Sequence, residues 1–293
     1  MIKVEMLYPQ GYCAGVKNAI AIAKKTRDEY PHSPIFIVGY LVHNKQVIET
    51  LESLNIHTLY DKNGDYSSLL SNLDKGSHII FPAHGHDEFY DNLAKSKQLF
   101  VTDAVCPKVK SNADLIKKEI LNNHQVIYIG ISKHPETAAA LSISKNIKLF
   151  DMNNPSLDLD ISDSSPLVVN QTTLNYLELA KIHEQIKNKY PLARFQNEIC
   201  NSTRKRQEAI TMLPKSVDCI IVVGDNASSN TNRLLEIAKT TQPQADSYLI
   251  NNVEQMSKAF FENKKHIVIS SGASTPTETI NMIYAYIVNS FAK

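Results

Sequence analysis

Short hydrophobic runs alternate with helix-like patterns along this chain. The first run, IKVEMLYPQ at 2–10, has the apolar content of a short strand. Beyond it, Val16, Ile20 and Ala23 recur at helical spacing, which predicts an amphipathic helix. Cys13 lies at the corner between them, where a side chain extends from the carboxyl end of a strand and open α/β sheets bind ligands. A lone cysteine at such a corner is more often a small buried residue, so its role depends on whether other cysteines occupy equivalent corners.

The same corner occurs twice more. FVTDAVCPKVKSNADLI at 100–116 and ARFQNEICNSTRKRQEAI at 193–210 each place a cysteine between a β-rich run and a helix. These cysteines, Cys106 and Cys200, follow Cys13 at intervals of 93 and 94 residues. The two helices are expected to bury one apolar face each, formed by Val109, Ala113, Ile116 and Ile120 in one and by Ala209, Met212 and Leu213 in the other.

Two further units follow each corner. IFIVGYLVHN, VIYIGISKHPE and IIVVGDNASSN are strands that end in a glycine and a polar tip, and HIIFPAHG, PLVVNQTTL and HIVISSGAST are strands that end in small polar loops. Strands that alternate with helices predict parallel sheets. We therefore expect an α/β fold of three similar small lobes, at 1–99, 100–193 and 194–293, with mainly parallel sheets around a pseudo-threefold axis. Cys13, Cys106 and Cys200 would meet at its centre, whereas Cys219, inside VDCIIVVG, is predicted to be a buried small hydrophobe.

Composition narrows the class of protein. The 293 residues carry a net charge of +1, which offers no electrostatic case for a nucleic-acid or membrane partner. The N-terminus lacks a signal-peptide core, and no window approaches the roughly 20 apolar residues of a membrane-spanning helix. We therefore expect a cytoplasmic protein, in which 4 widely spaced cysteines favour metal or redox chemistry over disulfides.

Three converging thiolates fit two kinds of metal group. Catalytic zinc keeps an open coordination position, although usually with histidine or carboxylate among its ligands. An iron–sulfur cube held by three cysteines leaves one iron open to substrate. His43, His84 and His134 compete as a fourth ligand, and each could equally be a hydrogen-bonded loop residue.

The polar tips around the cysteines predict an anion site. They are rich in imidazoles and neutral donors and lie at predicted helix N-termini, which favour anions. No GxxxxGK[ST] or GxGxxG loop is present. The expected phosphate cradle consists of His43, His84, Ser228, Ser229, Asn230 and Ser274. Glu136 is the only carboxylate among the tips, which makes it a candidate for proton transfer, with a water-facing helix-start glutamate as the alternative.

Nine motifs, in this order across nearly the whole chain, resemble the LytB/IspH family of 4-hydroxy-3-methylbut-2-enyl diphosphate reductases. They are GYCAGV, LVHN, AHG, DAVCP, HPE, NQTTL, EICNSTRKRQ, SSN and GAS. The resemblance implies reductive dehydroxylation of that diphosphate to isopentenyl and dimethylallyl diphosphate, the last step of the methylerythritol phosphate route. It also implies one [4Fe–4S] cluster per chain on Cys13, Cys106 and Cys200, with one open iron.

The resemblance assigns further roles. It implies a proton-delivering Glu136, a substrate-side Thr172 with Thr173 beside it, and a ferredoxin or flavodoxin as electron donor. The diphosphate pocket that it implies comprises His43, His84, His134, Ser228, Ser229, Asn230 and Ser274. We expect a monomer or a homodimer. Four positions depart from the family pattern, namely Pro82, Val105, Ser132 and Lys133.

Two other functions fit part of the pattern. A zinc hydrolase could use the same three cysteines, and assays of iron and sulfide against zinc would distinguish it. A redox sensor could carry an oxygen-labile cluster, but it would need neither a phosphate cradle nor a buried acid.

Overall fold

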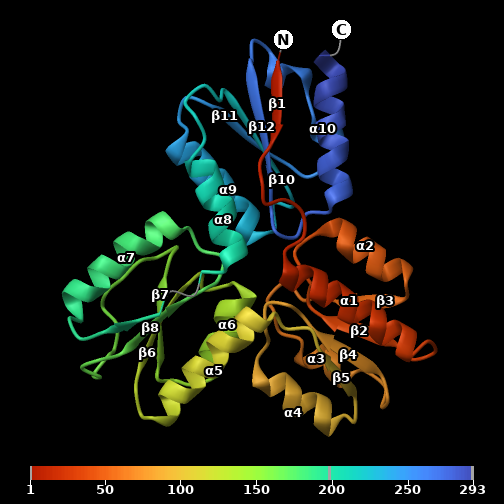
Figure 1. Ribbon diagram of the computed structural model, residues 1–293. Helices are drawn as coiled ribbons and strands as arrows, with labels where there is room; N and C mark the ends of the chain where they lie inside the picture. Colours follow the sequence, from red (N-terminus) through yellow and green to blue (C-terminus); the bar gives the residue numbers. More distant parts are fainter. Residues whose placement is uncertain (1, 197–198, 292–293) are drawn as a thin grey trace.

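The computed structural model describes residues 2–196 and 199–291, which form three α/β lobes around a common centre (Figure 1). Each lobe contains a four-stranded sheet whose strands are all parallel. The three sheets share one strand order. In each, the first strand of the lobe lies between the second and the third, and the strand that precedes a corner cysteine forms the edge beside the third. This arrangement confirms the expected three-lobed, parallel α/β fold.

The first lobe has the sheet order β3-β2-β4-β5. Its strands are β2 (Ile35–Val38), β3 (Ile56–Leu59), β4 (His78–Phe81) and β5 (Phe100–Asp103). Its helices are α1 (Ala14–Glu29), α2 (Lys45–Ser53), α3 (Ser67–Ser71) and α4 (Glu88–Ser96).

The second lobe repeats this order as β7-β6-β8-β9. Its strands are β6 (Val126–Gly130), β7 (Ile147–Asp151), β8 (Leu167–Asn170) and β9 (Arg194–Phe195). Its helices are α5 (Pro107–Leu121), α6 (Pro135–Ser142) and α7 (Tyr176–Lys189).

The third lobe, with the order β1-β12-β10-β11, contains both described ends of the chain (Figure 1). Its strands are β1 (Lys3–Met6), β10 (Cys219–Val223), β11 (Asp246–Ile250) and β12 (His266–Ser271). Its helices are α8 (Asn201–Thr211), α9 (Ser229–Thr241) and α10 (Thr277–Phe291), with the short 3₁₀ turns η1 (Val253–Gln255) and η2 (Lys258–Phe261).

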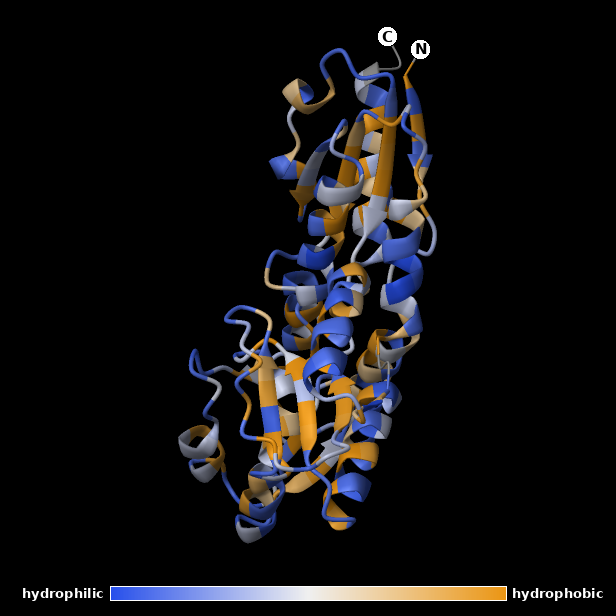
Figure 2. Ribbon diagram, turned by 90° about the vertical axis from the view of Figure 1, so that its left-hand side faces the viewer, coloured by the Kyte–Doolittle hydropathy of each residue, from blue (hydrophilic) through white to orange (hydrophobic). Residues whose placement is uncertain are grey.

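The central strands are buried because helices cover both faces of each sheet. Every residue of β6, β10 and β12 is buried, and the hydrophobic strands contrast with the mixed helices in Figure 2. Such continuous apolar runs are typical of parallel sheets. Cys219 is fully buried in the third core, which confirms its predicted place.

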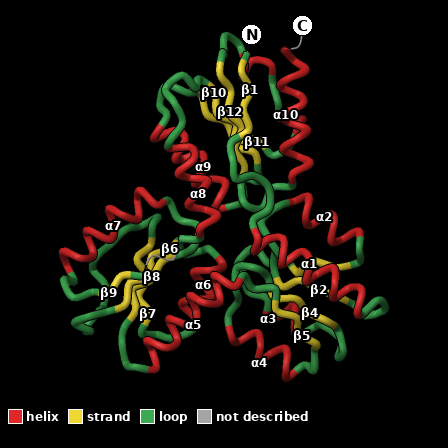
Figure 3. Tube along the Cα trace, in the orientation of Figure 1, coloured by secondary structure: helices red, strands yellow, loops and turns green. Residues whose placement is uncertain are grey.

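The sheets group the corner strands differently from the predicted lobe ranges. β1 pairs with β12, β5 with β4, and β9 with β8, so each strand before a cysteine completes the sheet of the preceding lobe in the ring. The chain therefore leaves one sheet at each corner and enters the next lobe through the following helix (Figure 3). The lobe boundaries expected from the sequence, at 1–99, 100–193 and 194–293, therefore stay predictions.

Of the apolar residues expected on α8, Leu213 packs against a core of the third lobe, but the expectation is wrong for Met212. Met212 lies at the end of the helix and is 79% exposed, whereas the helix buries Thr203, Arg206, Gln207 and Ile210. Arg206 and Gln207 hydrogen-bond to backbone groups of other segments, so polar residues cover this contact.

Candidate active site

The three corner cysteines occupy equivalent positions. Cys13, Cys106 and Cys200 are the N-cap residues of α1, α5 and α8. Each backbone N–H donates to a carbonyl in the loop after the third strand of a sheet. The acceptors are Ala273 at 2.9 Å, Ala83 at 3.0 Å and Thr172 at 3.0 Å, respectively. One hydrogen bond, repeated three times, therefore orients the three corners alike.

Gly15 allows the first two corners to approach one another closely. A Cβ atom at this position would lie 2.7 Å from the Cys106 Sγ and 3.8 Å from the Cys13 Sγ. Real Cβ atoms do not approach a sulfur so closely, so any larger residue would displace the Cys106 thiol from this position. All three thiols are free and partly exposed.

A central cavity of about 90 Å³ lies where the three lobes meet. Its walls carry the three thiols and all the substrate-binding residues expected from the sequence. These are His43, His84, His134, Thr172, Thr173, Ser228, Ser229, Asn230 and Ser274. The structure thus brings these side chains together from loops far apart in the chain.

Three imidazoles form one side of the cavity. The ring centroids of His43 and His84 are 4.8 Å apart, and those of His84 and His134 are 5.7 Å apart. Burial lowers the pKa of His134 to about 3, with smaller effects of His43 and Arg233. Burial also lowers the pKa of His84 well below its usual range. These histidines are therefore neutral at physiological pH.

Helix N-termini face the same space. His134 accepts the N–H of Glu136 at its Nδ1 atom, 3.2 Å away, and so caps α6 with its Nε2 atom protonated. Ser228 caps α9 in the same way, by accepting the N–H of Thr231. The positive ends of these two helix dipoles favour an anion in the cavity.

Some polar atoms in the cavity wall have no partner. Asn230 is only 5% exposed, yet neither its amide oxygen nor its amide nitrogen is hydrogen-bonded in the part of the chain that is described. The Nδ1 atom of His43 is likewise buried and unpaired. Because buried polar groups are normally satisfied, these atoms are expected to bind a ligand.

Glu136 lies behind Thr172 and does not line the central cavity. It is 3% exposed; its Oε2 accepts the Thr172 hydroxyl at 2.8 Å and its Oε1 accepts the Thr172 N–H at 2.8 Å. This burial excludes the water-facing alternative. Thr172 connects the carboxylate to the cavity, so a proton can pass between them along an existing hydrogen bond.

The sequence did not single out two residues that organise this region. Gln171 is fully buried and bonds the Ile131 N–H, the Thr137 hydroxyl and the Thr173 hydroxyl. Its position in the motif NQTTL, next to Thr172 and Thr173, could have indicated its role. Tyr128 donates to the Glu136 Oε1 at 3.5 Å, but within the apolar run VIYIG it resembles any core residue.

The departures from the family pattern lie outside the cavity wall. Ser132 and Lys133 are exposed in the turn before α6, where the Ser132 N–H donates to the Asp151 carboxylate. Pro82 is buried directly after β4, and Val105 borders a second cavity described below.

Two features are absent from the residues that the structure describes. Among the described residues, no three His, Cys, Asp or Glu side chains are close enough to hold one metal ion. No helix in the described ranges combines the length and the apolar character needed to cross a membrane.

The comparisons with known sequences agree over nearly the whole chain. The family model described as LytB protein matches residues 4–288. A 4-hydroxy-3-methylbut-2-enyl diphosphate reductase of Malacoplasma penetrans is 38% identical over 98% of this chain and 97% of its own. The reductase of the same name from Symbiobacterium thermophilum is 35% identical, with the same coverage of both chains.

Solved structures show the same fold. The E-1-hydroxy-2-methyl-but-2-enyl-4-diphosphate reductase of Plasmodium falciparum has a TM-score of 0.88 and 26% identity, over 98% of this chain and 88% of that one. A second structure, described as the terminal enzyme of the non-mevalonate pathway, has a TM-score of 0.68 and 26% identity, over 99% and 100%.

Proposed function

Since this chain belongs to the LytB protein family, we propose that it is a 4-hydroxy-3-methylbut-2-enyl diphosphate reductase, which converts its substrate to isopentenyl and dimethylallyl diphosphate in isoprenoid synthesis. The observation that carries this proposal is one cavity. It is lined by three free thiols and by uncharged side chains that can bind an anion, and Thr172 connects it to a buried carboxylate. Family membership and this combination support each other.

We propose that Cys13, Cys106 and Cys200 hold a [4Fe–4S] cluster with one open iron. The donor set fits, because thiolates are the usual ligands of such clusters and all three thiols are free and border one cavity. When bound, the cluster would supply electrons and a Lewis-acidic iron next to the substrate hydroxyl.

The diphosphate is proposed to lie among His43, His84, His134 and the Ser228–Asn230 turn. Neutral imidazoles and hydroxyls can donate hydrogen bonds to phosphate oxygens without presenting a like charge to one another. The unpaired amide of Asn230 and the two helix N-termini support this placement. Ser274 already donates to the carbonyl of His43 at 3.2 Å and so holds that loop in position.

Glu136 is proposed to supply the proton that the departing hydroxyl needs. Without it, breaking the C–O bond would expel hydroxide, which is a poor leaving group. Thr172 would transmit the proton, because its hydroxyl bonds the carboxylate and borders the cavity. The electrons would come from a one-electron carrier such as a ferredoxin or flavodoxin, in the cytoplasm.

Purification without oxygen tests this function. The protein should be brown, should contain iron and sulfide, and should consume the allylic diphosphate with reduced methyl viologen as donor. Replacing Cys13, Cys106 or Cys200 with serine should remove most of the iron, because a thiolate ligand is lost from one cube corner.

The fourth cysteine is the matched control. Cys219→Ser should leave the iron content close to wild type, since this thiol is buried in the third core. Equal iron loss from Cys219→Ser would contradict the ligand assignment. A well-folded brown protein that reduces no diphosphate would contradict the reductase.

A further inference from the structure

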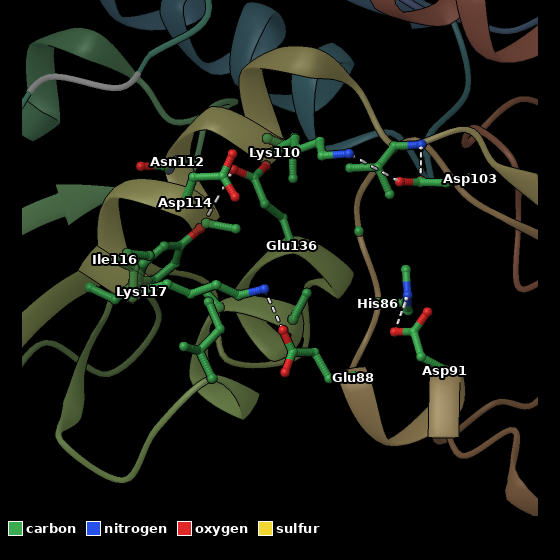
Figure 4. Close-up of a pocket in the computed structure, with 18 residues that line it drawn as sticks. His86, Glu88, Asp91, Asp103, Lys110, Asn112, Asp114, Ile116, Lys117 and Glu136 are labelled. Carbon is green, nitrogen blue, oxygen red and sulfur yellow. Dashed lines mark hydrogen bonds and ion pairs between the residues drawn. The ribbon is translucent and has the colours of Figure 1, made fainter. Parts of the chain in front are cut away.

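A second cavity, here called the outer cleft, lies between the first and second lobes (Figure 4). It has a volume of about 230 Å³, and α5, α6 and the segment before α4 enclose it. Its walls include Asp103, Lys110, Asn112, Asp114, Tyr128 and Glu136. The function proposed above does not use this space.

Glu136 separates the outer cleft from the central cavity. Its side chain borders the cleft directly, whereas Thr172 stands between it and the cavity. On the cleft side, Tyr128 borders the same space and donates to the Glu136 Oε1. The carboxylate can therefore be reached from two sides, and the cleft is the side that substrate would leave open.

The cleft also contains an unsatisfied buried group. Asn112 is 4% exposed; its amide nitrogen donates to the carbonyl of Asn170 at 3.1 Å, and its oxygen has no partner among the described residues. A buried amide oxygen with no protein partner is normally satisfied by a water molecule. The volume of the cleft is sufficient for several water molecules.

The charged rim provides contact with bulk solvent. Lys117 pairs with Glu88, His86 with Asp91 at 2.9 Å, and Lys110 with Asp103 at 3.8 Å (Figure 4). Most of these charged side chains are substantially exposed, whereas Asn112, Tyr128 and Glu136 are buried. Water in the cleft would thus connect titratable surface groups with the buried carboxylate.

Reductive dehydroxylation consumes protons. Each turnover breaks one C–O bond, forms one C–H bond, releases water and takes up two electrons and two protons. One of those protons leaves Glu136 with the departing hydroxyl, so the carboxylate must be reprotonated before the next cycle. We propose that protons reach Glu136 through the outer cleft, by way of Asn112-bound water and Tyr128, a route that rests on the reductase activity proposed above.

Filling the cleft tests this route. Ala139→Leu on α6 and Ala113→Leu on α5 place larger side chains on two of its walls. Steady-state turnover should fall by about tenfold or more, up to the about 10⁴-fold that a positioned acid can contribute. The first turnover, measured by rapid quench with excess reduced viologen, should stay within about twofold of wild type, because a single turnover does not require Glu136 to be reprotonated.

Ala138→Leu is the matched control, since Ala138 is exposed on the same helix and does not border the cleft. It should leave both rates unchanged, and all three variants should keep the melting temperature and iron content of wild type. The solvent deuterium isotope effect on steady-state turnover should increase only in the two cleft variants. If only one of the two cleft variants folds, the rates of that variant alone test the route.

Equal slowing of first and later turnovers, or a steady-state rate close to wild type in the folded cleft variants, would overturn the route. A wild-type protein that holds iron but reduces no substrate would instead overturn the proposed function, so the two failures are distinguishable.

Discussion

Among single residues, Glu136 shows how burial distinguishes two interpretations of a side chain. The sequence offered two interpretations of Glu136, a proton donor or a glutamate that faces water at the start of a helix. The structure buries the side chain and bonds both of its oxygens to Thr172. Tyr128 could not be predicted in the same way, because its contact depends on how α6 packs against β6.

Glu136→Gln should abolish most turnover while the site stays intact. The amide keeps the size of the side chain and can still hydrogen-bond to Thr172, but it cannot deliver a proton. We expect a decrease of about 10²- to 10⁴-fold in the rate of diphosphate reduction, with unchanged iron content and nearly unchanged affinity for a diphosphate.

Glu278→Gln is the control, because Glu278 lies exposed in the first turn of α10. It should leave turnover unchanged. If Glu136→Gln reduced substrate within about threefold of the wild-type rate, Glu136 would have no part in the mechanism.

Among the helices, α8 differs most from its sequence pattern. Its apolar residues indicated a face that includes Met212, yet the helix buries Arg206 and Gln207. The Arg206 guanidinium donates to the carbonyls of Gly11, Ser271 and Ser202, and Gln207 donates to that of Leu174. Hydrophobic periodicity cannot reveal a contact that consists of hydrogen bonds to backbone groups of other segments.

Arg206→Met should destabilise the protein although it replaces a charge with an apolar side chain. It leaves buried carbonyls unpaired, and one hydrogen bond from a charged donor contributes about 1.5–3 kcal/mol. Thermal unfolding should show a loss of at least this size. Met212→Ala, at the exposed end of α8, should change the free energy of unfolding by less than about 0.5 kcal/mol. Similar losses in both variants would contradict the role of Arg206.

At the scale of the whole molecule, the repeat predicted the three lobes because each copy carries the same strands and corners. The central cavity followed from it, since the carboxyl ends of equivalent strands meet at the centre. The pairing of β1 with β12 was not predictable, because it joins segments about 260 residues apart, and no local pattern specifies such a partner. The outer cleft depends in the same way on how two lobes pack.

Val4→Asp tests whether β1 is part of the third lobe. Val4 pairs with Ile267 and packs against the third core, so a carboxylate there would lose hydration without gaining a partner. We expect a loss of about 1–3 kcal/mol in thermal unfolding. Lys3→Ala, at an exposed position of the same strand, should have little effect. An unchanged melting temperature for Val4→Asp would show that β1 contributes nothing to this sheet.

The pairing of β1 with β12 also affects how the protein matures in a cell. A ribosome makes β1 first and β12 nearly last, so the earliest segment waits for its partner through most of translation. The first two lobes can fold as they emerge, because their strands pair within the first 195 residues. Cys13, whose N–H is held by the carbonyl of Ala273, reaches its final position only when the last lobe has folded. If Cys13, Cys106 and Cys200 hold a cluster, as proposed above, the full set of ligands would come together only after the strands and loops of the third lobe have folded.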